Sequence, residues 1–260
     1  MAISILSNAS SVAAQRHLSK SQRHMNTSLG RLASGLRIVR ASDDAAGLAI
    51  SESLRSQVRS LGAARRNAAD GISMSQTAEG ALNETHGMLM RMRELSVQAA
   101  NGTLDTDQRG MLNDEFSALR DEVDRIANVT EFNGTNLLNG ATTVTLQVGN
   151  GTGTNDEMSV STFDARSQSL ATGLNTASIS DASGAQNAMS MLDDAINQVS
   201  TIRSSFGVVQ NRLEVTMDRL HTAEENLGAA ESRIRDADIA SETSQMTRSQ
   251  ILMQAGVSML

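Results

Sequence analysis

Apolar residues recur every seven positions near both ends of this chain, which is the spacing of helices that pack lengthwise against another helix. The N-terminal stripe comprises Leu18, Met25, Leu32 and Val39, with Leu29 and Leu36 at the second stripe position. The C-terminal stripe comprises Ile239, Met246, Met253 and Leu260. A one-sided apolar face is unstable without a partner. The two stripes therefore predict terminal helices that pair with each other.

Three longer segments, residues 44–99, 105–128 and 187–228, carry apolar residues at intervals of three and four. The chain contains no proline, the strongest helix breaker. A continuous helix over 44–99 would be about 80 Å long at 1.5 Å per residue. The chain also lacks cysteine, tryptophan and tyrosine, whereas a compact core of this size is normally built around bulky aromatic side chains. This composition favours long helices that contact each other along seams over a compact enzyme core.

The middle of the chain has a different pattern. Residues 142–148 and 157–163 alternate apolar and polar side chains, as strands do, and the run between them, GNGTGTND, is typical of a hairpin turn. A connector rich in Ser, Thr, Asn and Gly follows to about residue 184. The predicted fold class is mainly α: a long antiparallel helical coiled-coil bundle with paired N- and C-terminal helices and a small β-hairpin region in the middle.

Folding back at the hairpin divides the chain into parts that come from both halves. Residues 1–43 and 230–260 are predicted to form two halves of an inner coiled-coil domain. Residues 44–140 and 186–229 are predicted to form two parts of a helical core domain, and 141–185 a short hairpin and variable linker.

No arrangement of residues in the sequence points to an enzyme. The four histidines are scattered, and His17 and His24 are seven residues apart, too far for two metal ligands on adjacent helical turns. The Gly-rich run at 149–156 does not open a helix after a strand, as a phosphate-binding loop does. We therefore predict no catalytic residue, no metal and no cofactor. No apolar run reaches the roughly 18 residues of a transmembrane helix, so no membrane insertion is expected.

Charge is distributed unevenly along the chain. Residues 1–42 contain six basic residues and no acidic one, and the remainder contains 16 basic and 29 acidic residues. Such asymmetry is found in nucleic-acid-binding arms, in transit peptides and in segments that dock on acidic surfaces. Lys20 is the only lysine, and the arginines have planar guanidinium groups that suit bidentate ion pairs between proteins. Composition bias explains the preference for arginine equally well.

Several long runs resemble bacterial flagellins closely. They are SGLRIVRASDDAAGLAISESLRSQVRSL (34–61), RMRELSVQAANGT (91–103), TEFNGTNLLNG (130–140), VQNRLE (209–214), ENLGAAESRIRDADIASE (225–242) and RSQILMQAG (248–256). They follow the order found in that family and lie in both halves of the chain. The resemblance covers nearly everything except about residues 141–185, so the sequence resembles a short flagellin with a minimal central variable region.

The resemblance implies a structural subunit that self-assembles into the bacterial flagellar filament and serves swimming motility. Family members are exported unfolded by the flagellar type III apparatus without a cleavable signal peptide, so an extracellular location in the filament is expected. The implied partners are other copies of the chain, flagellar cap and junction proteins, and an export chaperone at the C-terminal segment, with no nucleic acid. The stripes at sevens would pack within the subunit and on its neighbours. The Arg-rich residues 1–42 would neutralise acidic faces of neighbours or remain solvated.

The resemblance also concerns an innate immune receptor. It places Arg91, Leu95 and Glu115 on the surface that Toll-like receptor 5 binds. All three have the residue types found in stimulatory flagellins, which implies that the monomer activates this receptor.

Three other interpretations agree less well with the sequence. A hook–filament junction protein resembles flagellin at its termini, but the runs RIRDADIASE and SDDAAGLAISE are nearer to filament flagellins. A coiled-coil signalling adaptor would need transmembrane or docking segments, which are not seen in the sequence. A transit peptide over residues 1–40 is disfavoured because the stripe continues to Val39 and has a C-terminal counterpart. No helix stop signal precedes Leu260, so a chain trimmed relative to the family is expected.

Overall fold

The computed structural model of the protein describes residues 9–258, which divide into two compact units. The first unit comprises the residues up to Arg59 together with those from Ala223 onward, and the second comprises Ser60–Thr222. The divisions fall within two long helices, α2 (Ala45–Ala99) and α5 (Ala182–Arg235). These helices confirm the continuous helix predicted over 44–99 and extend the one predicted over 187–228.

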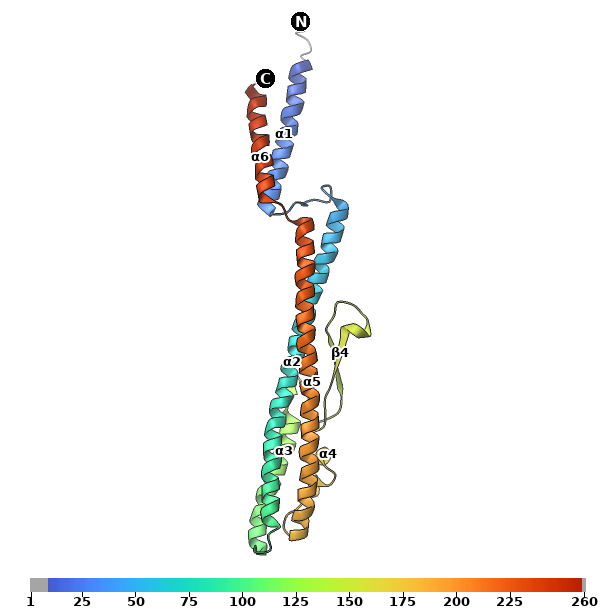
Figure 1. The fold of residues 1–260 in the computed structure, drawn as a ribbon, viewed down its shortest axis with the longest axis vertical. Helices are drawn as coiled ribbons and strands as arrows, with labels where there is room; N and C mark the ends of the chain where they lie inside the picture. The colour runs from blue at the N-terminus through green and yellow to red at the C-terminus, as the bar shows by residue number, and fades with distance from the viewer. Residues whose placement is uncertain (1–8, 259–260) are drawn as a thin grey trace. The chain divides into compact units, whose positions relative to one another are not determined.

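The first unit pairs the helices nearest the two ends of the chain. Helices α1 (Ala9–Ser34) and α6 (Ile239–Ser258) lie side by side and run antiparallel (Figure 1), as predicted. Helix α1 ends before Gly35, whose φ of +71° is the left-handed conformation that glycine supplies at helix ends. The prediction that the helical stripe continues to Val39 is therefore wrong, because Val39 lies in the connector between α1 and α2.

The connectors that follow α1 and α5 hold each other in place. Residues 35–37 and 235–237 pair in the antiparallel direction, with the Arg37 amide donating to the Arg235 carbonyl at 2.6 Å. The Arg37 guanidinium donates to the Ile234 carbonyl at 2.6 Å. A cation on the last carbonyls of a helix interacts favourably with the helix dipole, so Arg37 both joins the connectors and caps α5.

In the second unit, α2, α3 (Thr106–Val129) and α5 lie alongside one another (Figure 1). The three helices share a large apolar core, and a smaller cluster joins α2 and α5 to the predicted hairpin region. Helix α3 begins with a capping box, in which the Asp105 carboxylate accepts from the Gln108 amide and the Gln108 side chain accepts from the Asp105 amide. The turn between α2 and α3 therefore supplies the helix cap. Fully buried core residues of the three helices include Leu82, Leu89, Met92, Phe116, Val123, Leu192, Val199 and Phe206.

The predicted hairpin is present. Strands β3 (Thr143–Gln147) and β4 (Glu157–Ser161) pair antiparallel, with Val144 opposite Val160, and the short helix η1 (Thr154–Asp156) lies in their turn. Val160 is buried while its neighbours in β4 are exposed, as the period of two predicts.

A second, smaller hairpin was not predicted from the sequence. Strands β1 (Glu131–Phe132) and β2 (Thr135–Asn136) pair antiparallel. Asn133 and Gly134 between them have φ values of +49° and +76°, the backbone of the two-residue Asn-Gly turn that joins short antiparallel strands. The Asn-Gly pair was a usable signal, but two-residue strands carry too little alternation to be recognised.

The connector after β4 is packed rather than loose. It contains two short helices, α4 (Ser167–Leu170) and η2 (Leu174–Thr176). Side chains of α3 hold it: the Asp124 carboxylate accepts from the amide and hydroxyl of Ser167 at 2.6 and 2.9 Å, and Asn113 Oδ1 accepts from the Ile179 amide at 2.9 Å. The connector buries Ala165, Leu170, Leu174 and Ile179 in the core.

Replacing Asp164 with asparagine should destabilise the protein at neutral pH. The Asp164 carboxylate accepts from the Arg166 guanidinium at 2.6 and 2.9 Å and from the Ser169 hydroxyl at 2.7 Å. The hydrogen bonds from Arg166 lower the pKa of Asp164 from 3.8 to about 2. Because the folded-state pKa is lowered, the stabilisation is fully present above pH 3.8 and is lost as the pH falls through about 2.

Urea unfolding followed by circular dichroism measures this effect. We expect the Asp164→Asn variant to lose about 1–2 kcal/mol at pH 7, after allowance for solvent screening, and the difference from the wild type to close near pH 2. Asp193→Asn is the control, because the pair that Asp193 makes with Arg93 is half exposed. An equal loss at pH 7 and near pH 2 would contradict the expectation.

Candidate functional site

The seam between α1 and α6 contains most of the predicted packing residues. The half-buried residues at intervals of seven are Leu18, Met25 and Leu32 on α1 and Met246 and Met253 on α6. A Cβ built on Gly256 would lie 3.6 Å from Leu18 Cδ1, so the Leu18 side chain packs close to the α6 backbone near this end of the seam. This spacing indicates a seam of one large apolar side chain for each heptad.

A second position in each heptad, three or four residues from these large apolar side chains, also faces the seam and holds small or polar residues. Ser28 on α1 and Glu242 and Ser249 on α6 are buried. The prediction that leucines fill the second stripe position is wrong for Leu29, which is 46% exposed. Leu36 lies in the connector beyond the end of α1.

Glu242 forms the polar contact between the two helices. Its Oε2 accepts from the Ser28 hydroxyl and its Oε1 from Arg31 Nη1, each at 2.8 Å. Burial opposes ionisation of this carboxyl group, but the hydrogen bonds from Arg31 and Ser28 and the Arg31 charge outweigh it and lower the pKa of Glu242. A buried polar group is costly unless it is paired. This triad therefore favours the register in which the three residues meet.

The remaining predicted packing residues lie outside this seam. Val39 is 45% exposed in the connector, Ile239 is 51% exposed at the first residue of α6, and Leu260 lies outside the described residues. Other large apolar side chains are exposed on the outer faces of the helix pair: Val12, Leu29, Ile251, Leu252 and Val257. Two helices bury only the faces they turn toward each other, so an apolar outer surface is left uncovered within the described chain.

Two of the three residues predicted for receptor binding meet on the surface of the second unit. Arg91 on α2 pairs with Glu115 on α3 at 2.9 Å and with Glu94 at 3.1 Å. The hydrogen bond from Glu115, followed by that from Glu94, raises the pKa of Arg91. The prediction that Leu95 belongs to this exposed surface is wrong, because Leu95 is 1% exposed and packs in the core. The exposed apolar neighbours are Met90 and Val97.

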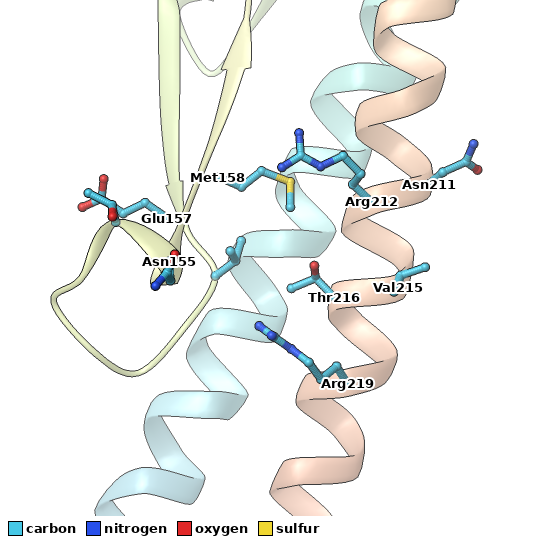
Figure 2. A pocket seen from close by; sticks show the side chains of 10 residues that line it. Asn155, Glu157, Met158, Asn211, Arg212, Val215, Thr216 and Arg219 are labelled. Carbon is cyan, nitrogen blue, oxygen red and sulfur yellow. The ribbon is translucent and has the colours of Figure 1, made fainter.

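A hollow of about 580 Å³ lies between the β3–β4 hairpin and α5 (Figure 2). Arg212 and Arg219 reach from α5 on either side of Thr216, and Met158 extends from the hairpin toward α5 (Figure 2). Glu157 is the only acidic residue that lines it. General acid–base catalysis needs a positioned acid and base, and nucleophilic catalysis needs an activated nucleophile. The residues that line this hollow form neither arrangement.

Within residues 9–258, no group of three or more His, Asp or Glu side chains gathers in a way that would hold a metal ion. No helix in this part of the chain is both long and apolar enough to cross a membrane.

Two family models match the two halves of the chain. Residues 5–143 match the bacterial flagellin N-terminal helical region, and residues 189–260 match the bacterial flagellin C-terminal helical region. The chain belongs to the bacterial flagellin family. It is a structural subunit of the flagellar filament, and flagellins as a family are structural proteins of the extracellular filament.

Known flagellar filament proteins are similar in sequence to nearly the whole chain. A flagellin of Halalkalibacterium halodurans is 46% identical over 97% of this chain and 93% of its own length. A flagellin of Bacillus subtilis is 46% identical over 93% of this chain and 88% of its own length. The flagellar filament 33 kDa core protein of Treponema phagedenis is 41% identical over 97% and 93% of the two chains.

Solved structures share the fold. The crystal structure of Bacillus cereus flagellin is 32% identical, with a TM-score of 0.53 over 60% of this chain and 88% of that one. A putative flagellar hook-associated protein of Vibrio parahaemolyticus has a TM-score of 0.62 over 75% of this flagellin and all of that chain, at 14% identity. The second likeness concerns the fold alone. Fold therefore does not separate a filament subunit from a hook-associated protein, and sequence identity favours the filament subunit.

Proposed function

We propose that this flagellin polymerises through its paired terminal helices, with neighbouring copies covering the apolar outer faces of α1 and α6. The uncovered residues Leu29, Ile251 and Leu252 carry this proposal. Identical copies supply matching apolar faces in a helical polymer, and burial of these faces offsets the chain entropy lost on ordering. The packing positions of the proposal are Leu18, Met25, Leu32, Val39, Ile239, Met246, Met253 and Leu260.

The domain division predicted from the sequence belongs to the same proposal. Residues 1–43 and 230–260 form the inner coiled-coil domain of the filament. Residues 44–140 and 186–229 form the helical core domain, and 141–185 form the hairpin and linker between its two parts. The pairing of α1 with α6 supports the first of these assignments.

Negative-stain microscopy of the purified protein under polymerising conditions tests the proposal. We expect long helical filaments, together with a sedimenting fraction that grows above a critical concentration. A folded full-length protein that forms no filaments at any concentration tested would contradict self-assembly.

Membership of the flagellin family suggests an export route and accessory protein partners. We propose that the chain leaves the cell unfolded through the flagellar type III apparatus, and the absence of cysteine supports this because no disulfide has to be avoided or broken. The apolar outer face of α6 suits an export chaperone before assembly. Flagellar cap and junction proteins complete the set of proposed partners.

A receptor interaction is proposed for the surface around Arg91 and Glu115. A soluble monomer is expected to activate a Toll-like receptor 5 reporter. Arg91→Glu should raise the concentration needed for half activation about tenfold, because it replaces the cation of this surface with an anion. Arg125→Glu is the control, because Arg125 also pairs on an exposed face, with Glu122, but on α3 alone. No response to the wild-type monomer would reject the interaction.

A further inference from the structure

A cationic hollow lies within the first unit, between the C-terminal half of α1 and the connector before α2. Its volume is about 470 Å³. Three arginines line it, Arg23 and Arg31 from α1 and Arg40 from the connector, and Asp43 is the only acidic residue among its lining. Asn26 and Ser42 add an amide and a hydroxyl group. The hollow therefore carries more positive than negative charge.

The acidic residues close to this hollow are already engaged. Glu242 pairs with Arg31, and Asp43 Oδ2 accepts from the backbone amides of Val39 and Arg40 at 3.2 and 2.9 Å. Among the described residues, no carboxylate forms an ion pair with Arg23 or Arg40. Within residues 9–258, the guanidinium groups of Arg23 and Arg40 therefore have no carboxylate partner.

The charges of Arg31 and Arg40 both act on the carboxylate of Asp43. The pKa of Asp43 is lowered, first by the hydrogen bond from the Arg40 amide and also by the charges of Arg31 and Arg40. Arg31 and Arg40 therefore both lie near the Asp43 carboxylate, although neither forms an ion pair with it in the described structure. Arg31 Nε is in addition buried without a hydrogen-bond partner in the described structure, and a buried donor left unpaired is costly.

We propose that this hollow binds a carboxylate side chain of a second copy of the chain. A guanidinium group forms paired, charge-assisted hydrogen bonds with a carboxylate, and the hollow is lined by two that form no ion pair in the described structure, those of Arg23 and Arg40. Charge complementarity identifies the partner: residues 1–42 contain no acidic residue, whereas the rest of each copy has 29 acidic and 16 basic residues. The inference rests on the proposed self-assembly and adds a polar contact to its apolar seams.

Cross-linking identifies what enters the hollow. Lys20 is the only native lysine, so Arg40→Lys places a single new amine there. A carbodiimide joins an amine to a contacting carboxylate, and filaments grown from mixed 15N-labelled and unlabelled protein distinguish cross-links within a copy from those between copies. We expect cross-links from position 40 to an acidic residue of another copy, and few from the matched control Arg16→Lys, which is on the exposed face of α1. Cross-links only to Asp43 or Glu242 of the same copy would overturn the proposal.

Assembly provides an independent measurement. The double variant Arg23→Gln/Arg40→Gln should raise the critical concentration for sedimentation about tenfold, and Arg16→Gln should leave it within about twofold. Raising NaCl from about 50 to about 300 mM should affect the double variant less than the wild type, because salt screens the ion pairs it lacks. Both arginines are exposed, and circular dichroism verifies that the variant folds. A double variant that assembles like the wild type refutes the carboxylate site, whereas a wild type that never assembles refutes self-assembly itself.

Discussion

Replacing Phe206 with alanine is expected to lower the free energy of unfolding by about 3–5 kcal/mol, the range found when a buried phenylalanine is truncated. Phe206 on α5 is 1% exposed. Its ring meets Phe163 edge to face, with the centroids 5.5 Å apart. Phe163 follows β4, so the two rings join α5 to the segment that leaves the hairpin. Truncation removes this contact and leaves a cavity that neighbours held in helices do not fill completely.

Urea unfolding followed by circular dichroism measures the change, since the chain has no tryptophan or tyrosine to serve as a fluorescent reporter. Val208→Ala is the matched control: Val208 lies on the same helix, is 55% exposed, and should change the free energy of unfolding by less than about 0.5 kcal/mol. Phe206→Leu keeps part of the buried volume and should cost about 1–2 kcal/mol. Equal stability of the alanine variant and the wild type would show that the two rings do not carry the packing of this unit.

The long helices were predictable because their signals are local and repeated. The heptad spacing of Leu18 and Met25, or of Met246 and Met253, persists over several turns without a proline to interrupt it. The hairpin was predictable for a similar reason, since its two strands alternate on either side of a Gly-rich turn. In each case, the residues that decide the structure are neighbours in the chain.

The second seam position of α1 and α6 was not predictable from apolar spacing. Ser28 is buried because its hydroxyl reaches Glu242, 214 residues away, whereas the adjacent Leu29 faces outward. Apolar spacing therefore predicts that Leu29 is buried and gives no signal for Ser28. The burial of Ser28 instead depends on a hydrogen bond between distant parts of the chain.

Two buried features were not predicted, for different reasons: the packing of the connector after β4, and the burial of Leu95. The connector is held by Asp124 and Asn113, which contact it from 43 and 66 residues away, and its own composition resembles that of a loose linker. Leu95 was placed on the surface by family resemblance. Its spacing of three residues from Met92 and four from Ala99, both buried, was a local signal for the core.

Replacing Met246 with aspartate is expected to raise the critical concentration for filament assembly about 30- to 150-fold, equivalent to about 2–3 kcal/mol for each added subunit. Met246 is half-buried in the seam between α1 and α6. The substitution removes an apolar side chain, whose burial contributes about 1.5–3 kcal/mol when complete. It also puts a carboxylate four residues after Glu242, and like charges at this spacing on a helix repel each other. Arg31, the cation nearest Glu242, is already paired with it.

Sedimentation and microscopy of three variants separate the causes of this change. Met246→Leu conserves volume and should assemble at nearly the wild-type concentration. Met246→Asn introduces polarity without charge and should lie between leucine and aspartate, so the step from asparagine to aspartate measures the repulsion from Glu242. Residues Ser60–Thr222 form a separate compact unit, so its urea unfolding should be unchanged in all three variants. Every subunit of such a filament would carry the substitution. Assembly of the aspartate variant at the wild-type concentration would therefore show that polymerisation does not depend on an intact α1–α6 seam.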